Sequence, residues 1–106
     1  MVIKNFELPT ETIADVCRRH GVEELSLFGS ALRDDFAPES DLDFLVVFKN
    51  NDAGPWMSKF MDLEEELSRS LGRRVDVVDK RGVEQSENYI RRRHILSSAR
   101  VVYVAR

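Results

Sequence analysis

The sequence predicts a single α/β domain, 1–106, with one mixed β-sheet and helices packed mainly on one face. Its length, 106 residues, suits one ordinary domain. Hydrophobic residues make up 42% of the chain, which is enough for one core. Segments with helical and strand periodicity alternate in the order α-β-β-α-β-α-β, and this alternation is typical of an α/β fold.

A helix is expected close to the start of the chain. Residues 8–10, Leu-Pro-Thr, are typical of a helix start, with Thr10 as the capping residue. Apolar side chains then follow at the spacing of a buried helix face, and Gly21 stands where a helix commonly ends.

Two strands should follow this helix. Residues 24–28 are short, partly apolar and followed by Gly29, which predicts a strand that runs into a turn. Residues 42–48 are apolar on both alternating faces, which is the pattern of a central strand covered on both sides.

The second half of the chain predicts a turn, two helices and two strands. Asn, Asp, Gly and Pro in residues 50–55 predict the turn. Apolar positions then advance by three or four residues over 56–71, which predicts a long helix. A strand over 74–79, a helix over 86–100 and a final strand over 101–104 complete the predicted fold.

Composition narrows the function classes. With 16 basic and 19 acidic residues the net charge is -3, so direct binding to nucleic acid is not expected. The lone Cys17 cannot form an internal disulfide and suits a reducing compartment. No apolar run approaches the roughly 20 residues of a membrane span, and no signal peptide is visible. We expect a soluble, cytoplasmic protein.

Two carboxylates stand at the start of the predicted central strand. Asp41 and Asp43 project from the same face because side chains alternate, with their roots roughly 6.6 Å apart. A divalent cation between them would remove their mutual repulsion. Oxygen ligands of this type suit Mg²⁺ or Mn²⁺ and not zinc. The alternative is that both side chains are simply solvated at the start of a strand.

Asp76 is the third acidic element of this pattern. It lies between two valines in the strand predicted over 74–79, and a strand-helix-strand unit can bring it beside Asp41 and Asp43. Three carboxylates at one sheet end can hold one or two divalent ions, and two-ion sites are suited to in-line displacement at phosphorus. The alternative places Asp76 on the polar face of an edge strand.

Gly29 and Ser30 form a turn that suits a phosphate. A residue without a side chain lets backbone N–H groups approach a phosphate closely, and Ser30 adds a hydroxyl donor. The start of a short helix here would favour an anion. Arg33 could reach the phosphate or pair with Asp34 or Asp35. An ordinary turn is the alternative.

Together these motifs resemble a known family. Leu-Phe-Gly-Ser-Ala-Leu-Arg, a ten-residue gap, Ser-Asp-Leu-Asp-Phe-Leu-Val and then Val-Asp-Val-Val resemble the nucleotidyltransferases of the DNA polymerase β superfamily. The motifs span 25–78 in a chain barely longer than this core, which resembles the minimal nucleotidyltransferase (MNT) branch. Asp34 stands where many relatives have glycine, a difference that affects the helix after the turn.

The resemblance implies a polymerase β-like fold and a metal-dependent transferase. It implies that Gly29 and Ser30 hold the triphosphate of ATP, and that Asp41, Asp43 and Asp76 bind two Mg²⁺ ions. AMP would then be transferred with release of pyrophosphate. Minimal nucleotidyltransferases are typically antitoxins paired with a HEPN ribonuclease toxin. The resemblance therefore implies adenylylation of a toxin tyrosine, with toxin and antitoxin able to form a hetero-oligomer.

Two other functions stay open. One is a binding module that neutralises its partner by steric occlusion, without catalysis. The other is a nucleotidyltransferase of the antibiotic-modifying kind, although such relatives use an additional helical domain for which 106 residues leave no room.

Three charged features have structural interpretations. The run Arg91–Arg93 is expected to be a solvated helix side, and the alternative is a contact to an acidic partner or an RNA backbone. The acidic run Glu64–Glu66 is interpreted as the exposed side of its helix. His20 and His94 lack companions at metal-ligand spacing and are interpreted as structural.

Overall fold

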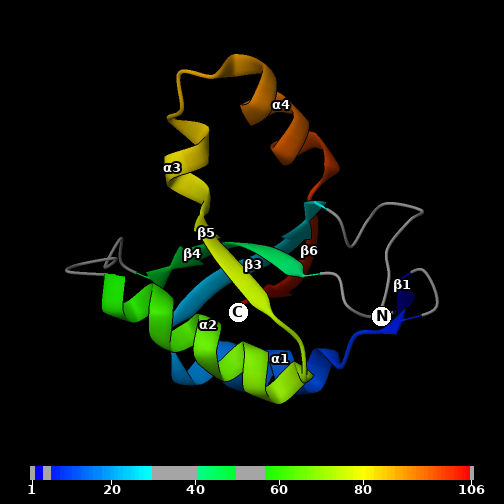
Figure 1. Ribbon diagram of the computed structural model, residues 1–106. Helices are drawn as coiled ribbons and strands as arrows, with labels where there is room; N and C mark the ends of the chain where they lie inside the picture. Colours follow the sequence, from blue (N-terminus) through cyan, green and yellow to red (C-terminus); the bar gives the residue numbers. More distant parts are fainter. Residues whose placement is uncertain (1, 4–5, 30–40, 50–56, 106) are drawn as a thin grey trace.

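The computed structural model describes residues 2–3, 6–29, 41–49 and 57–105 (Figure 1). Its elements, in chain order, are β1 (Val2–Ile3), β2 (Phe6–Glu7), α1 (Thr10–Arg19), β3 (Val22–Phe28), β4 (Leu42–Phe48), α2 (Met57–Leu71), β5 (Val75–Asp79), α3 (Lys80–Glu84), α4 (Tyr89–Ser98) and β6 (Arg100–Val104).

Four strands form a single open, mixed sheet in the order β5-β4-β3-β6. The pairs β3–β4 and β3–β6 are antiparallel, whereas β4 and β5 are parallel and are joined through α2. This confirms the predicted α/β class with one mixed sheet. The sequence did not predict β1 and β2, which pair with each other as a separate two-stranded ribbon.

The helices that build the core share one face of the sheet. α1 and α2 lie side by side below the sheet in Figure 1, and they contact each other, β3, β5 and β6. The pair α3–α4 stands on the other side and buries only Ile95 among its side chains. The predicted packing of helices mainly on one face is therefore confirmed for α1 and α2, the two helices that supply apolar side chains to the core.

The core fills the layer between α1, α2 and the sheet. Its fully buried side chains come from two helices and three strands. They are Ile13, Val16, Cys17, Val22, Leu25, Leu27, Leu42, Phe44, Val46, Phe48, Leu63, Leu67 and Val75. On β4 the side chains of Leu45 and Val47, which alternate with this set, are buried as well. The prediction of a central strand covered on both faces is thus confirmed.

The start of α1 differs from the sequence expectation. Thr10 is the first helical residue and not its cap, because Pro9 occupies the N-cap position and no side chain bonds there. The backbone N–H of Ile13 donates to the carbonyl of Pro9 instead, at 3.0 Å. The next strand begins at Val22, two residues earlier than predicted.

The C-terminal helical region is also divided differently. The helix predicted over 86–100 is present as α4, and α3 is an additional short helix before it. A side chain caps the start of each. The carboxylate of Asp79 accepts the N–H of Arg81 at the start of α3, and the amide oxygen of Asn88 accepts the N–H of Arg91 at the start of α4. The turn predicted over 50–55 lies outside the described residues.

None of the helices in the described part of the chain combines the length and the apolar composition that crossing a membrane requires.

Candidate active site

The sheet brings three of the predicted site residues to one of its ends. In the antiparallel pair, Phe28 at the end of β3 lies opposite Asp43, so Gly29 follows directly beside the start of β4. In the parallel pair, Asp43 lies opposite Asp76. Two acidic side chains and a glycine from distant parts of the sequence therefore meet at this edge, as the strand-helix-strand argument predicts.

Gly29 has a specific steric reason to be a glycine. Its backbone is left-handed, with φ of 78°. A Cβ atom at this position would stand 2.5 Å from the Oδ2 atom of Asp43 and 3.3 Å from its Cγ atom. The Asp43 carboxylate thus occupies the space that a side chain at position 29 would need. The sequence argument assigned that space to a phosphate, whereas the structure shows the neighbouring carboxylate in it.

The acidic side chains face away from the core. Along β4, Leu42 and Phe44 point into the core, so alternation places Asp43, together with Asp41 just before the strand, on the opposite face. Asp43 is half-buried and Asp76 is exposed. This face is opposite the one that packs against α1 and α2, so a ligand can approach the carboxylates without displacing the core.

Asp76 sits on a strand that α2 holds in place by side-chain hydrogen bonds. The backbone N–H of Val75 donates to Oγ of Ser68 at 3.1 Å, and that of Val77 donates to Oε2 of Glu64 at 3.0 Å. These two bonds satisfy the outer edge of β5 on either side of Asp76. Ser68 and Glu64 are thus positioning residues that the sequence analysis missed.

The role of the run Glu64–Glu66 therefore needs correction. Only Glu65 is fully exposed, whereas Glu64 and Glu66 are half-buried and hydrogen-bonded. Helical periodicity could have signalled this, because Glu64 is one residue past the buried Leu63 and Glu66 one residue before the buried Leu67.

The donor types at this sheet end fit a hard divalent cation. Asp41, Asp43 and Asp76 offer carboxylate oxygens only, which Mg²⁺ and Mn²⁺ prefer. As placed, their side chains do not converge into a three-ligand group, and no such group of His, Cys, Asp or Glu occurs elsewhere in the described residues. The residue types thus suit such a cation, and its binding by these three residues stays a prediction.

Two predicted site residues, Ser30 and Arg33, lie outside the described residues, as do Asp34 and Asp35. Their contribution to phosphate binding stays a prediction.

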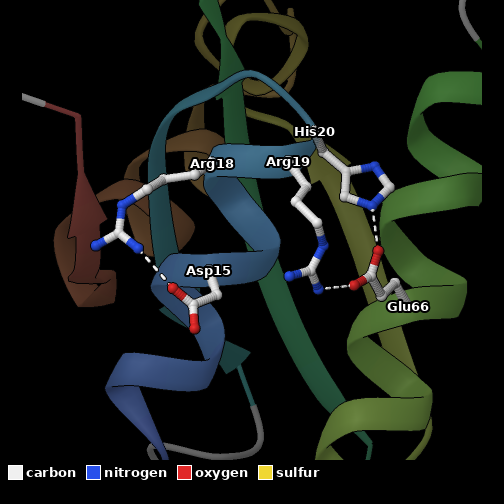
Figure 2. A network of polar contacts seen from close by, with 5 residues as sticks. All are labelled: Asp15, Arg18, Arg19, His20 and Glu66. Carbon is white, nitrogen blue, oxygen red and sulfur yellow. Dashed lines mark hydrogen bonds and ion pairs between the residues drawn. The ribbon is translucent and has the colours of Figure 1, made fainter.

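A separate polar network joins α1 to α2 (Figure 2). Glu66 on α2 is ion-paired with Arg19, and its Oε1 atom lies 2.7 Å from Nε2 of His20, the residue that caps α1. The Arg19 guanidinium and then the His20 ring lower the pKa of the Glu66 carboxyl below its usual value. On the exposed side of α1, Arg18 pairs with Asp15 at 2.6 Å. His20 thus has the structural role that the sequence suggested.

Comparison with known proteins identifies the family. Residues 10–102 match the model of the nucleotidyltransferase domain family, which covers most of the chain. The protein adenylyltransferase MntA of Thermococcus cleftensis is 45% identical over 62 residues. That match covers 58% of this chain and 60% of the relative, so the chain aligns with somewhat less than two thirds of that protein.

Two solved structures have a similar fold. A protein assigned to the minimal nucleotidyltransferases superposes with a TM-score of 0.65 at 33% identity, over 86% of each chain. The MNT antitoxin complex with the tri-AMPylated HEPN toxin of Shewanella oneidensis superposes with a TM-score of 0.60 at 17% identity. That match covers 91% of this chain and 70% of the solved one. With its glycine and paired aspartates at one sheet end, the chain belongs to the nucleotidyltransferase domain family.

Proposed function

We propose that this chain transfers AMP from ATP to a tyrosine of a partner HEPN-type ribonuclease toxin, and that it acts as the antitoxin. The observation that carries this proposal is the meeting of Gly29, Asp43 and Asp76 at one sheet end of a nucleotidyltransferase domain. The adenylyltransferase relative and the fold shared with an MNT antitoxin support the nucleotide and the partner.

The reaction forms one bond and breaks one at phosphorus. The tyrosine oxygen bonds to the α-phosphorus of ATP, the bond from that phosphorus to the bridging oxygen breaks, and pyrophosphate leaves. The tyrosine proton passes to a carboxylate, for which Asp76 is our candidate because it is exposed to an approaching acceptor. The acceptor oxygen must be held about 3–3.5 Å from phosphorus and in line with the leaving group.

The remaining site residues divide between binding the triphosphate and binding metal. Gly29, Ser30 and Arg33 would contact the phosphates through backbone N–H groups, a hydroxyl and a guanidinium. Asp41, Asp43 and Asp76 would hold two Mg²⁺ ions, with Mn²⁺ as a substitute. When bound, such ions neutralise charge on the phosphates and lower the pKa of the attacking hydroxyl.

Added AMP would silence the toxin for a physical reason. A nucleotide on a tyrosine near a ribonuclease active site brings bulk and negative charge to the place where an RNA phosphate binds. Electrostatic repulsion and steric occlusion would then both oppose substrate binding.

Mass spectrometry tests this proposal directly. With ATP and Mg²⁺, the wild-type chain should add AMP mass to a tyrosine of the HEPN-type partner. The Asp41→Asn/Asp43→Asn variant should add none while keeping its circular dichroism spectrum, because removing like charges does not disturb the core. Full transfer by this double variant would contradict the assignment of Asp41 and Asp43 as metal ligands.

The same variant separates catalysis from simple binding. If it still neutralises the toxin while no adduct forms in any sample, the binding-module alternative replaces the enzymatic proposal. The Asp76→Asn variant tests its candidate ligand and base separately, and wild-type transfer would assign Asp76 to the polar face of an edge strand.

A further inference from the structure

α4 is a helix with little support from the rest of the molecule. Among its ten residues, Tyr89–Ser98, only Ile95 is buried. A helix this short is marginal in water unless one face packs against other elements. Instead, its first turn exposes apolar groups: Tyr89 is 57% and Ile90 is 80% exposed.

The same region carries an excess of positive charge. Residues 80–100 hold six Lys or Arg and two Glu, although the whole chain has a net charge of -3. Lys80 is paired with Glu24 at 3.2 Å. Arg91 and Arg93 are exposed, and neither forms an ion pair with another described residue. Two arginine charges on α4 are therefore available to a partner.

Arg92 has a different role, because its contacts hold α4 in position. Its Nη1 atom donates to the carbonyl oxygens of Glu84 at 3.3 Å and Ser86 at 3.2 Å. Its guanidinium carbon lies 5.3 Å from the centre of the Tyr89 ring. Arg92 thus joins α4 to the end of α3 and restrains Tyr89. Because this surface is already ordered, less conformational entropy is lost when a partner binds.

A cavity lies beneath α4 and has room for a large side chain. It measures about 270 Å³ and is bounded by β5, α3 and α4. Val78, Val83 and Ile95 line it together with Arg91, Arg92 and Asp79. The carboxylate of Asp79 is engaged in capping α3, where it accepts the N–H of Arg81. An apolar cavity bordered by guanidinium groups suits an apolar side chain that is flanked by carboxylates.

The position of α4 relates this surface to the candidate active site. α4 leads into β6, whose first residue Arg100 pairs with Leu27, two residues before Gly29. In Figure 1 the C-terminal end of α4 accordingly lies beside the end of β3. A protein bound to α4 would therefore stand close to the sheet end that carries Asp43 and Asp76.

We propose that the arm formed by residues 80–98 is the docking surface for the acceptor protein, and that it receives an acidic segment with one large apolar side chain. The apolar side chain fills the cavity, and carboxylates of the segment pair with Arg91 and Arg93. This inference rests on the proposed function for the identity of the acceptor. The exposed Ile90 favours a protein over RNA, because a nucleic-acid surface gains little from aliphatic groups.

Charge reversal tests the docking surface. Calorimetric titration without nucleotide would compare wild type, Arg91→Glu/Arg93→Glu and Ile90→Asp, each against the HEPN-type partner. We expect at least tenfold weaker binding for both variants. Lys49→Glu/Arg69→Glu is the matched control, because both of its residues are exposed, lie outside the arm and give the same change in charge. This control should bind within about twofold of wild type.

Each outcome bears on one of the two proposals. Equal binding by wild type and the arm variants overturns the docking surface, as does the absence of any complex. Tighter binding of a single-stranded RNA oligonucleotide than of the protein, lost in Arg91→Glu/Arg93→Glu, overturns the choice of a protein. The AMP-adduct assay tests the transfer reaction separately. If wild type binds the partner, the arm variants do not, and wild type forms no adduct, only the proposed function is contradicted.

Discussion

Gly29 and Gly72 share a left-handed backbone but have different surroundings. Their φ angles are 78° and 64°. A Cβ atom on Gly29 would collide with the Asp43 carboxylate, whereas one on Gly72 would meet nothing within 4 Å. The pair therefore separates the cost of backbone strain from the cost of disturbing Asp43.

We expect backbone strain to lower the free energy of unfolding by similar amounts in Gly29→Ala and Gly72→Ala, roughly 1–2 kcal/mol each. Both substitutions force an L residue into the left-handed region. Only Gly29→Ala should also abolish AMP transfer, since its methyl group displaces Asp43. Urea unfolding and the AMP-adduct assay measure the two effects. Equal transfer by both variants would show that the close approach to Asp43 has no functional consequence.

At the scale of elements, α2 acts on the candidate site through β5. β5 is an edge strand, and an unpaired edge normally invites other strands. Hydrogen bonds from Val75 to Ser68 and from Val77 to Glu64 occupy its outer N–H groups. These bonds also hold the segment that carries Asp76 against α2.

Replacing Ser68 by Ala should therefore cost about 0.5–1.5 kcal/mol of stability, the net value of one such bond, and should reduce AMP transfer by misplacing Asp76. Ser70→Ala is the control, because Ser70 is exposed on the same helix. Urea midpoints and transfer rates give the comparison. Identical behaviour of the two variants would mean that β5 needs no bond from α2.

The ion pair between α1 and α2 should make stability depend on pH. The pKa of Glu66 is lowered in the folded state, chiefly by Arg19. A carboxyl group with a depressed folded pKa stabilises the protein above its unfolded pKa, near 4.5, and this contribution is lost as pH falls through the folded value. The effect acts on the packing of α1 against α2 (Figure 2).

In urea unfolding between pH 3 and 8, Glu66→Gln should be less stable than wild type near neutral pH, and the difference should shrink as pH falls below about 4.5. Glu65→Gln, which alters the exposed neighbour, should follow wild type throughout. A gap between wild type and Glu66→Gln that does not change with pH would contradict the assigned role of the ion pair.

At the scale of the whole molecule, the sequence predicts best what local patterns encode. The strand over 42–48 has the predicted bounds because its apolar run is continuous and flanked by polar residues. The parallel pairing that brings Asp76 beside Asp43 also follows from a strand-helix-strand unit. The spacing of Asp41, Asp43 and Asp76 predicted one carboxylate site, and the family resemblance then implied its role in nucleotidyl transfer.

Features that depend on tertiary contacts could not be predicted from the sequence. Nothing local shows that the space beside Gly29 is taken by Asp43, or that Glu64 faces a strand edge. The additional helix α3 and the start of α4 depend on the capping side chains of Asp79 and Asn88. Two-residue strands such as β1 and β2 are too short to leave a periodic pattern.

The lone cysteine offers a probe of the whole fold. Cys17 is fully buried in the core between α1 and the sheet, and burial raises the pKa of its thiol to about 12. At pH 8 the native thiol is therefore both inaccessible and almost entirely protonated, and the thiolate is the reactive form. Labelling should proceed only through unfolding that opens the core.

We expect an alkylating reagent to label native Cys17 at least about a thousandfold more slowly than the urea-unfolded chain, because ordinary domains are stable by 5 kcal/mol or more. The rate should rise with urea in parallel with the loss of circular dichroism. Ser70→Cys is the internal control: its exposed thiol should react at once, giving one adduct in the native state and two after unfolding. Rapid labelling of Cys17 before any spectroscopic change would mean that α1 detaches from the sheet while the rest stays folded. The core would then open in parts, with α1 leaving before the sheet that carries the candidate active site.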